Sequence, residues 1–594
     1  MGTTPMAEGS GPARRWAVAG MAIAIAWSLY QSGLGRQPIV NWGGMPQFGQ
    51  FFRAGLHPDI SGEFLALMGR AAGVTFAYAV CGTVLSLGLG FVGGVLSSEV
   101  WWRTLWPRRP WAGRPLWVTV RAVLAVPRAI HELIWGLIFI NLIGLDPLVA
   151  VLAIAVPFGA IVAKVFSEIL DETPPEPLTA LGMAGVPPIQ ALLYGLLPQA
   201  LPNLLSYSFY RFECSLRSSA VLGLIGAGGL GYEMLLSLQS LRYEQLWTAF
   251  YALIVLNGAV DTWSALVRRQ LGFTSRLALN LRKRRAIAPA AGEPVAAPNA
   301  AIASPTAPPP ATLSQGWLSA GLSRGLLPLS AFGVAIAIPL CFWVLQLDWG
   351  QLWAAQTLQR IAEMGRMGQP PALTIEQVST LASLASQTVA MSILAIALAG
   401  VGGLVFSFPA AQTFLMPGGV LRPVAESSGG GWGAAIALVA TRLVLLVSRA
   451  VPAPIWALVF LYILFPGIVP GAIALALHNF GILGRLMAEA NENLDDRPVR
   501  ALRSLGASSA GVVLYGLLPQ NLGGFMAYTL YRWEVCLRET VIVGLVGAGG
   551  LGRLMTEQLS SFDYAGLALT LGVFVGLTLG VDLISAGLRR ALRS

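Results

Sequence analysis

The sequence predicts an all-α, polytopic membrane protein of two parallel tandem repeats, each with about six transmembrane helices. The first reason is composition: of 594 residues, 55% are hydrophobic and only 11% are charged, less than half of the charged share usual in globular proteins. The second is the recurrence of apolar runs of about 20 residues, the length that crosses a bilayer. The third is that the second half of the chain repeats the first.

The first apolar run, Trp16 to Leu29, follows Arg14 and Arg15 and resembles a signal peptide. Because no convincing small-x-small cleavage site follows it, whereas further hydrophobic segments do, we expect an uncleaved first span with a cytoplasmic N-terminus. Further spans are expected at residues 64–97, 117–143, 147–169, 192–216, 246–267, 324–346, 379–407, 433–465, 468–490, 513–537 and 566–588.

The interval 282–316 separates the two sets of spans. It is basic at its start and then rich in Ala and Pro, with too few large apolar residues to pack a core. Such a composition favours a flexible, extended cytoplasmic linker. It divides the chain into a first transmembrane domain at 1–281 and a second at 317–594.

A shift of 321 residues aligns the C-terminal parts of the two halves without a gap. The hexapeptide from Tyr194 to Gln199 recurs unchanged from Tyr515 to Gln520. Shared composition does not produce a repeat of this length, so we interpret it as a duplication. An even number of spans in each copy gives both copies the same orientation, related by a pseudo-twofold axis along the membrane normal.

The arginines support this orientation. Arg268 and Arg269, and their equivalents Arg589 and Arg590, follow the last span of each half, as the positive-inside rule expects of cytoplasmic ends. The net charge of +10 therefore reflects cytoplasmic loops rather than the soluble basic face of a nucleic-acid-binding protein. We expect both termini of the chain to be cytoplasmic.

The loop between the fourth and fifth spans of each half has a repeated spacing. Gly185 precedes Pro198 by thirteen positions, and Gly506 precedes Pro519 by the same number. A short helix, a glycine turn and a second helix that enters the membrane fit this spacing, because glycine adopts backbone conformations closed to other residues and proline reshapes a helix. An ordinary helix–loop–helix is the alternative.

The segments that read SLGAS, LYGLLPQ, YTLYRWEV and VGLVGAGGLG resemble the phosphonate-type permeases of ABC importers, over most of both halves. The resemblance implies a type I ABC importer-like fold and a coupling helix in each loop that sits in a groove of the ATPase subunit. The glutamate of that family is replaced by Thr179 and Arg500 here, so docking is expected to use other contacts. The coupling positions that the resemblance implies are Gly185, Val186, Pro198, Gly506, Ser508 and Pro519.

Tyrosines and ionisable residues recur in the fifth span of each half, where charges are costly and mark functional sites by default. Arginine suits phosphonate or phosphate oxygens, because its planar fork donates two parallel hydrogen bonds. The alternative is structural: an i,i+4 pair such as Glu213–Arg217 stabilises the fold, or the residues lie at the outer interface. The predicted pathway residues are Tyr207, Tyr210, Arg211, Glu213, Arg217, Tyr528, Tyr531, Arg532, Glu534 and Arg538.

A G-x-G-x-x-G pattern follows each of these spans. A dinucleotide-binding fingerprint needs a preceding strand in a soluble βαβ unit, whereas here the neighbours are membrane spans. We therefore expect an irregular break near the outer mouth of the pathway, which is tolerated where it lines a cavity or is buried in protein. It would form an outer gate or, alternatively, a close helix contact. The glycines are Gly226, Gly228, Gly229, Gly231, Gly547, Gly549, Gly550 and Gly552.

The chain has two lysines, Lys164 and Lys283, and neither follows a glycine. No G-x-x-x-x-G-K-[ST] phosphate loop is therefore present, and we expect ATP to be used by partner subunits rather than by this chain. The four cysteines and three histidines suggest no metal site, and no catalytic set is recognised. We expect a transport component rather than an enzyme, with no cofactor of its own.

These features lead to one functional hypothesis and its alternatives. The chain is expected to form the pathway for a small oxyanion (phosphonate, phosphite or phosphate) in the bacterial plasma (inner) membrane, together with two ABC ATPase subunits and an extracytoplasmic substrate-binding protein. The alternatives are an ABC permease for another small solute, such as an amino acid or an organic sulfonate, and an ion-driven secondary transporter. The latter would favour acidic residues in mid-span, whereas Asp261 and Asp582 are expected near cytoplasmic helix ends.

Overall fold

The structure is a computed structural model, and it describes residues 10–36, 38–106, 111, 113–270, 317–368, 374–415, 431–494, 497–508 and 511–593. The linker predicted at 282–316 lies outside the described residues. In the described ranges the chain is helical, with one isolated antiparallel bridge between Val40 and Leu464. This confirms the all-α class.

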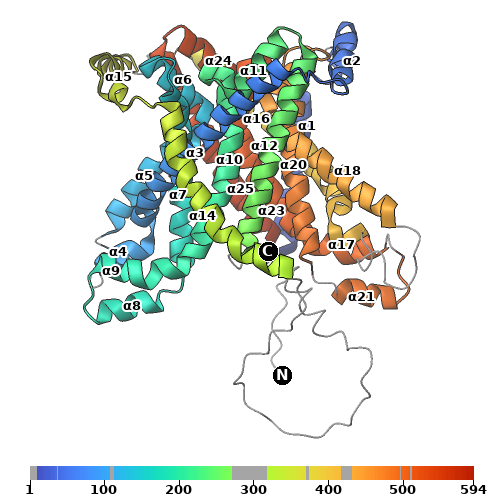
Figure 1. Cartoon of the computed structure of the whole chain (residues 1–594). Helices are drawn as coiled ribbons and strands as arrows, with labels where there is room; N and C mark the ends of the chain where they lie inside the picture. Colours follow the sequence, from blue (N-terminus) through green and yellow to red (C-terminus); the bar gives the residue numbers. More distant parts are fainter. Residues whose placement is uncertain are drawn as a thin grey trace.

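The first half contains helices α1 to α12, which lie side by side across the molecule or cap its two ends (Figure 1). Their bounds are α1 (Ser10–Gln31), α2 (Met45–Ala54), α3 (Gly62–Ser97), α4 (Glu99–Leu105), α5 (Arg114–Ala129), α6 (Glu132–Ile143), α7 (Pro147–Glu172), α8 (Glu176–Met183), α9 (Pro188–Ala191), α10 (Leu197–Leu222), α11 (Gly229–Gln239) and α12 (Tyr243–Gln270).

The second half repeats this order. Its bounds are α14 (Trp317–Leu345), α15 (Ala355–Met367), α16 (Ile375–Ala410), α17 (Gln412–Leu415), α18 (Gly431–Ala450), α19 (Ala453–Phe460), α20 (Ile468–Glu492), α21 (Arg497–Ser504), α23 (Leu518–Val543), α24 (Gly550–Ser560) and α25 (Tyr564–Arg593).

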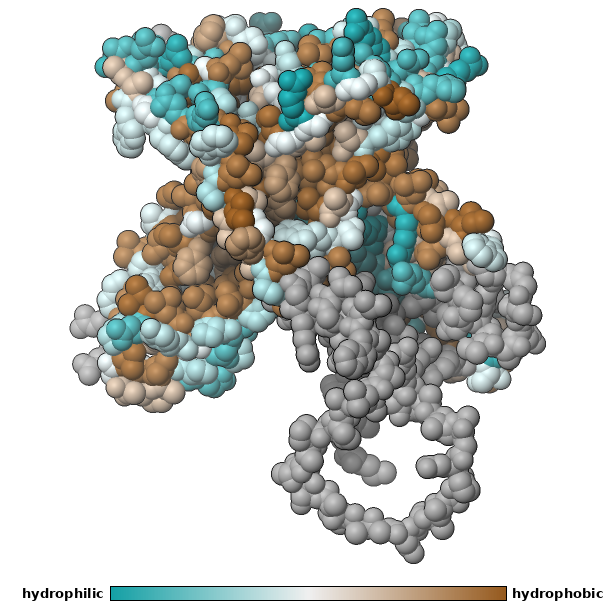
Figure 2. Space-filling model, in the orientation of Figure 1, coloured by the Kyte–Doolittle hydropathy of each residue, from teal (hydrophilic) through white to brown (hydrophobic). Residues whose placement is uncertain are grey.

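Eight helices in the described ranges are long and apolar enough to cross a membrane, and the number rises to eleven if each of three sharply bent helix pairs counts as one span. Figure 2 shows the apolar surface as a belt below one hydrophilic end of the molecule. The first predicted span is helix α1, which is not among those eleven.

The spans predicted at 117–143 and 433–465 are each interrupted near the middle. In the first half α5 and α6 meet at an angle of 87°, because Ile130 and His131 have extended backbones and the His131 side chain caps α6. In the second half α18 ends at Ala450, just before Pro452. Proline lacks the N–H that a continuing helix needs, and it disfavours helical backbone in the residue before it.

Close packing of α3 on α7, and of α16 on α20, forms the core of each half. Small residues allow these helices to approach: a methyl group at Gly90 would lie 2.3 Å from Val162 Cγ1, and one at Gly403 would lie 3.1 Å from the Gly484 nitrogen. Glycines at such positions are typical of helix contacts inside membranes.

The two halves exchange their first helices. Helix α1 of the first half packs against α16 and α25, whereas α14 of the second half packs against α3 and α12. Each half is therefore held by a helix that belongs to the other. Helices α8 and α21 lie at one end of the molecule, and α11 and α24 lie at the opposite end (Figure 1).

Candidate functional site

A cavity of about 180 Å³ lies between the two halves, where α10 and α23 face each other. Residues from the start of α6 and from α7 line it on one side, and residues from the start of α19 and from α20 line it on the other. Five arginines and two glutamates are among the lining residues. The cavity therefore has an excess of positive charge in a region that otherwise consists of apolar helices.

Seven of the ten predicted pathway residues line this cavity. The repeat therefore brings the two copies of the motif together across the boundary between the halves. The seven are Tyr207, Tyr210, Arg211, Arg217, Tyr531, Arg532 and Arg538.

The other three predicted residues lie elsewhere. Glu213 receives a hydrogen bond from Arg268 at 3.1 Å, and Glu534 receives one from Arg589 at 2.5 Å. Tyr528 lines a separate surface pocket beside Glu489. The two glutamates thus join the fifth span of each half to its last helix, which is a structural role.

The predicted Glu213–Arg217 pair does not form. Arg217 Nε instead bonds to the backbone oxygen of Glu213 at 3.4 Å, and Nη2 lies 3.8 Å from Cys214 Sγ. The Glu213 carboxylate is used by Arg268, which reaches it from α12. Helix spacing allowed the intrahelical pair, but a neighbouring helix supplied a better-placed cation.

Arg211 is 7% exposed, and its guanidinium lies over the ring of Phe158 with Cζ 3.8 Å from the ring centroid. Stacking on an aromatic face partly compensates a buried cation. The Arg211 Nε and Nη2 atoms are buried without a hydrogen-bond partner.

Arg532, the equivalent of Arg211, has polar partners. Its Nε donates to Asn479 Oδ1 at 2.9 Å, and its Nη2 lies 3.0 Å from Glu539 Oε1. Asn479 Nδ2 in turn donates to the other oxygen of Glu539 at 2.9 Å. These three side chains form a closed, charge-neutral network in the second half.

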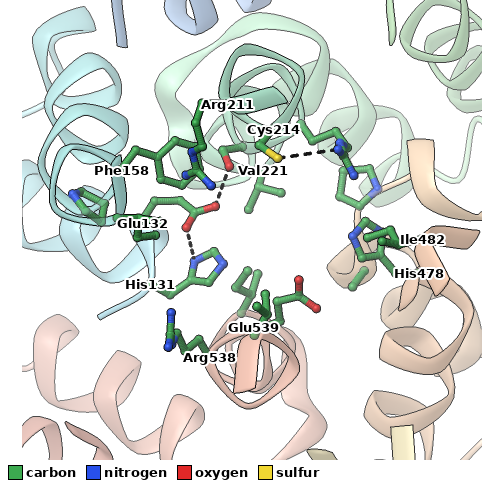
Figure 3. A pocket seen from close by; sticks show the side chains of 18 of the residues that line it. His131, Glu132, Phe158, Arg211, Cys214, Val221, His478, Ile482, Arg538 and Glu539 are labelled. Atoms are coloured by element: carbon green, nitrogen blue, oxygen red, sulfur yellow. Dashed lines mark hydrogen bonds and ion pairs between the residues drawn. The ribbon is translucent and has the colours of Figure 1, made fainter. Parts of the chain in front are cut away.

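The cavity also contains two glutamates and two histidines that were not predicted as pathway residues: Glu132, Glu539, His131 and His478. Figure 3 shows Glu132 and His131 on one side of the cavity and Glu539 and His478 around the facing side. Glu132 accepts a hydrogen bond from Ser218 at 2.6 Å and lies 3.2 Å from His131 Nδ1. The rule that ionisable residues inside spans are functional candidates also applies to Glu132 and Glu539, and would have found them.

The glycine patterns form sharp breaks, as predicted. The helical segments on either side meet at 56° in the first half and 69° in the second. Six of the eight glycines have positive φ values, from +71° at Gly550 to +102° at Gly547, a region that other residues rarely adopt. The break in each half lies at the end of the molecule opposite α8 and α21 (Figure 1).

The glycine turns of the two loops are confirmed. Gly185 and Gly506 both have a φ of +80° and follow α8 and α21, respectively. Beyond each turn a π-helical segment leads into α10 and α23, with Pro198 and Pro519 in the first turn. Val186 directly follows Gly185, and Ser508 stands two positions after Gly506. Thr179 and Arg500 stand where the family has a glutamate. Thr179 is exposed, and the side chain of Arg500 is not among those that the structure describes.

Residues 107–271 and 439–594 match the family described as binding-protein-dependent transport system inner membrane components. The phosphate-import permease protein PhnE of Mycolicibacterium smegmatis is 29% identical over 478 residues, which cover 80% of this chain and 77% of that protein. The phosphite transport system permease protein PtxC of Stutzerimonas stutzeri is 29% identical over 42% of this chain and 86% of its own length.

The putative cryptic phosphonate transport system permease protein PhnE2 of Escherichia coli is 37% identical over 20% of this chain and 97% of its own length. A solved structure of the MetNI methionine ABC transporter in an inward-facing conformation aligns with 37% of this chain at 19% identity, with a TM-score of 0.32. The assignment rests on the two sequence matches, which together include more than half of the residues. The chain therefore belongs to the family of binding-protein-dependent transport system inner membrane components.

Proposed function

We propose that this chain forms the translocation pathway of an ABC importer for a small oxyanion: phosphonate, phosphite or phosphate. The observation that carries the proposal is the central cavity, where five arginines from both halves face two glutamates. Guanidinium groups bind the oxygens of such anions with parallel, charge-assisted hydrogen bonds. The relatives described above are named as permeases for phosphate, phosphite and phosphonate, which supports the same class of solute.

The proposal includes the surroundings of the pathway. Two ATPase subunits bind the cytoplasmic end through α8 and α21, and an extracytoplasmic binding protein delivers the solute to the end that carries α11 and α24. Both chain termini are cytoplasmic. The helices have the arrangement of a type I importer, and the chain itself needs no cofactor. The repeated loop geometry at Gly185 and Gly506 supports two equivalent ATPase contacts.

In the proposed cycle, ATP binding draws the ATPase subunits together and moves α8 and α21 with them. The glycine breaks at the opposite end then open, and the oxyanion passes to the arginines of the cavity. Hydrolysis reverses the movement and opens the cytoplasmic side. The chain's own contribution is to position donors for the anion and to exclude lipid from its path.

Uptake measurements test this function. Cells that lack other routes for inorganic phosphate, phosphite and methylphosphonate would express the chain with its ATPase and binding protein. We expect uptake of at least one of these anions, lost when the ATPase is inactivated. Uptake that persists with an inactive ATPase, or transport of none of the three anions, would contradict the proposal.

Crosslinking tests the coupling positions. Cysteines placed at Val186 and Ser508 should form crosslinks to the ATPase, because both residues follow the glycine turns. A cysteine at Leu56, which is exposed near α2 at the other end, is the matched control and should not. Failure at every position of both loops would remove the coupling assignment while leaving the pathway assignment intact.

A further inference from the structure

The two repeats place the same arginine in two different surroundings. Arg532 is engaged by Asn479 at 2.9 Å and by Glu539 at 3.0 Å. Asn479 is equivalent in the repeat to Phe158, and the Arg211 guanidinium lies over that ring instead of bonding to an amide. The arginine of the second repeat therefore has a carboxylate in direct contact, whereas no ion pair to Arg211 is found among the described residues.

The carboxylates of the two halves also differ in position. Glu132, at the start of α6, is held by Ser218 at 2.6 Å and lies close to His131. The equivalents of Glu132 and Ser218 in the second repeat are Ala453 and Glu539. In the first repeat the acidic side chain is at the start of α6 and accepts from a serine of α10. In the second repeat the acidic side chain takes the position of that serine, on the same helix as the arginine, and binds the arginine.

Arg211 retains one edge of its guanidinium for a ligand. Its Nε and Nη2 form one edge of the planar group, and both are buried without a partner. Among the described residues none forms an ion pair with Arg211, and a buried donor that lacks an acceptor is unfavourable. Two parallel N–H groups on one edge fit two oxygens of a single phosphorus centre. Among the described residues, the other fully buried arginine atom of the cavity without a partner is Arg538 Nε, and its side chain is held by an Nη2 bond to Asp582 at 3.4 Å.

We propose that the oxyanion binds off the pseudo-twofold axis, on the Nε/Nη2 edge of Arg211, and that Arg532 is a structural residue which Glu539 withholds from the anion. This inference rests on the proposed function, because it assigns the solute to one side of the same cavity. Figure 3 shows the arrangement, with Arg211, Phe158 and Glu132 on one side and Glu539 and Arg538 on the facing side. Both repeats carry the arginine, but three neighbouring positions differ between them (Phe158/Asn479, Glu132/Ala453 and Ser218/Glu539). These differences leave only the first arginine with an unpaired edge that can bind the anion.

A transplant of the second-repeat surroundings into the first repeat tests the inference. The variant Phe158→Asn, Glu132→Ala, Ser218→Glu gives Arg211 the neighbours of Arg532 and keeps the number of cavity carboxylates unchanged. Loss of a charge-assisted bidentate contact is expected to reduce uptake of the transported anion (inorganic phosphate, phosphite or methylphosphonate) by about tenfold to a hundredfold. Co-purification with the ATPase and the thermal unfolding midpoint check that the variant assembles.

The reciprocal variant is the matched control. Asn479→Phe, Ala453→Glu, Glu539→Ser gives Arg532 the neighbours of Arg211 and should raise uptake at low anion concentration, because a second free edge then faces the cavity. If the first triple variant fails to assemble, Phe158→Asn alone tests the same point. The new amide oxygen would accept from Arg211 and should lower the affinity for the anion severalfold.

The outcomes separate this inference from the proposed function. Wild-type chain that transports an oxyanion, beside an assembled first-repeat variant that transports it equally well, would overturn the one-sided site alone. Equal losses in Arg211→Gln and Arg532→Gln, with both proteins assembled, would place the anion on the axis and also overturn it. Wild-type chain that transports none of the three anions would overturn both proposals together.

Discussion

Asp261 of the first half and Arg449 of the second form an ion pair of 2.5 Å, in which neither side chain is more than 18% exposed. Arg485, also of the second half, reaches the same carboxylate oxygen at 3.2 Å. The equivalent aspartate, Asp582, binds Arg538 of its own half at 3.4 Å. Helix α12 of the first half therefore forms its ion pair with the second half. Helix α25 of the second half forms the equivalent ion pair within its own half.

We predict that Asp261→Asn destabilises the protein by about 3 kcal/mol, because removal of one partner leaves a buried, uncompensated charge on Arg449. Chemical denaturation in detergent micelles measures the change. Asp582→Asn is the matched control, and its effect should be smaller, since that pair is longer and its aspartate is 27% exposed. An Asp261→Asn variant as stable as the wild type would show that the pair between the halves contributes nothing.

Substitution of Gly185 or Gly506 by alanine should loosen the end of α8 or α21. Both glycines have a φ of +80°, and a methyl group there would meet no other atom within 4 Å, so the cost of about 1–2 kcal/mol comes from the backbone alone. Hydrogen exchange of the α8 amides should become faster in Gly185→Ala. Gly182→Ala, inside α8 and equally free of contacts, is the control and should slow exchange, because alanine favours helix. The same direction in both variants would contradict this explanation.

Two threonine hydroxyls support the glycine breaks. Thr75 of α3 accepts a hydrogen bond from the Leu230 N–H at 2.8 Å, and Thr388 of α16 accepts one from Leu551 at 3.0 Å. These N–H groups belong to the first turns of α11 and α24, where a helix offers no partner of its own. Each break is thus joined to the core helix of its half by one side chain.

Thr75→Val keeps the shape of the side chain but removes the acceptor, so the Leu230 N–H remains buried and unpaired. We expect a loss of stability of about 1–3 kcal/mol and faster hydrogen exchange at the start of α11. Thr262→Val removes only a bond within an exposed part of α12 and should change stability by about 0.5 kcal/mol or less. Unchanged exchange at Leu230 in Thr75→Val would show that water or another group replaces the hydroxyl.

Features encoded in a short stretch of sequence were predicted well. The apolar runs became helices, and the glycines at 185 and 506 adopted positive φ, because each depends on residues within a few positions. The partner of Glu213 could not be read in the same way, since it depends on where the end of α12 lies when α10 and α12 pack. The i,i+4 spacing predicted Arg217 as the partner of Glu213, whereas in the folded chain the partner is Arg268 of α12.

Contacts between the halves were beyond the sequence for the same reason. The repeat identifies which residues are equivalent, but not that α1 lies against α16 and α25 of the other half. The neutralisation of Arg532 by Glu539 also required the structure, because Glu539 has no acidic counterpart at the aligned position, Ser218. The repeat predicts equivalent positions in the two halves, whereas the candidate site depends on the positions at which the two halves differ.

The segment before α2 provides a final contact between the halves that the sequence did not predict. Asn41 N donates to the Ile463 oxygen at 2.8 Å, and Phe465 N donates to the Ile39 oxygen at 3.0 Å. This short antiparallel pairing lies at the same end of the molecule as the glycine breaks. It joins the first half's outer segment to the connection between α19 and α20.

We predict that Gly44→Ala separates this pairing, because the new methyl group would lie 1.5 Å from the Tyr462 carbonyl oxygen. Backbone must move to relieve such a clash, at a cost of about 1–3 kcal/mol. Cysteines at Val40 and Leu464, in a background without the four native cysteines, should form a disulfide readily in otherwise unchanged protein and slowly with Gly44→Ala. Gly49→Ala, where α2 leaves open space, is the control and should not slow it. Equal rates in both variants would mean that the segment adjusts without leaving the second half, and the pairing would then be more adaptable than its close approach implies.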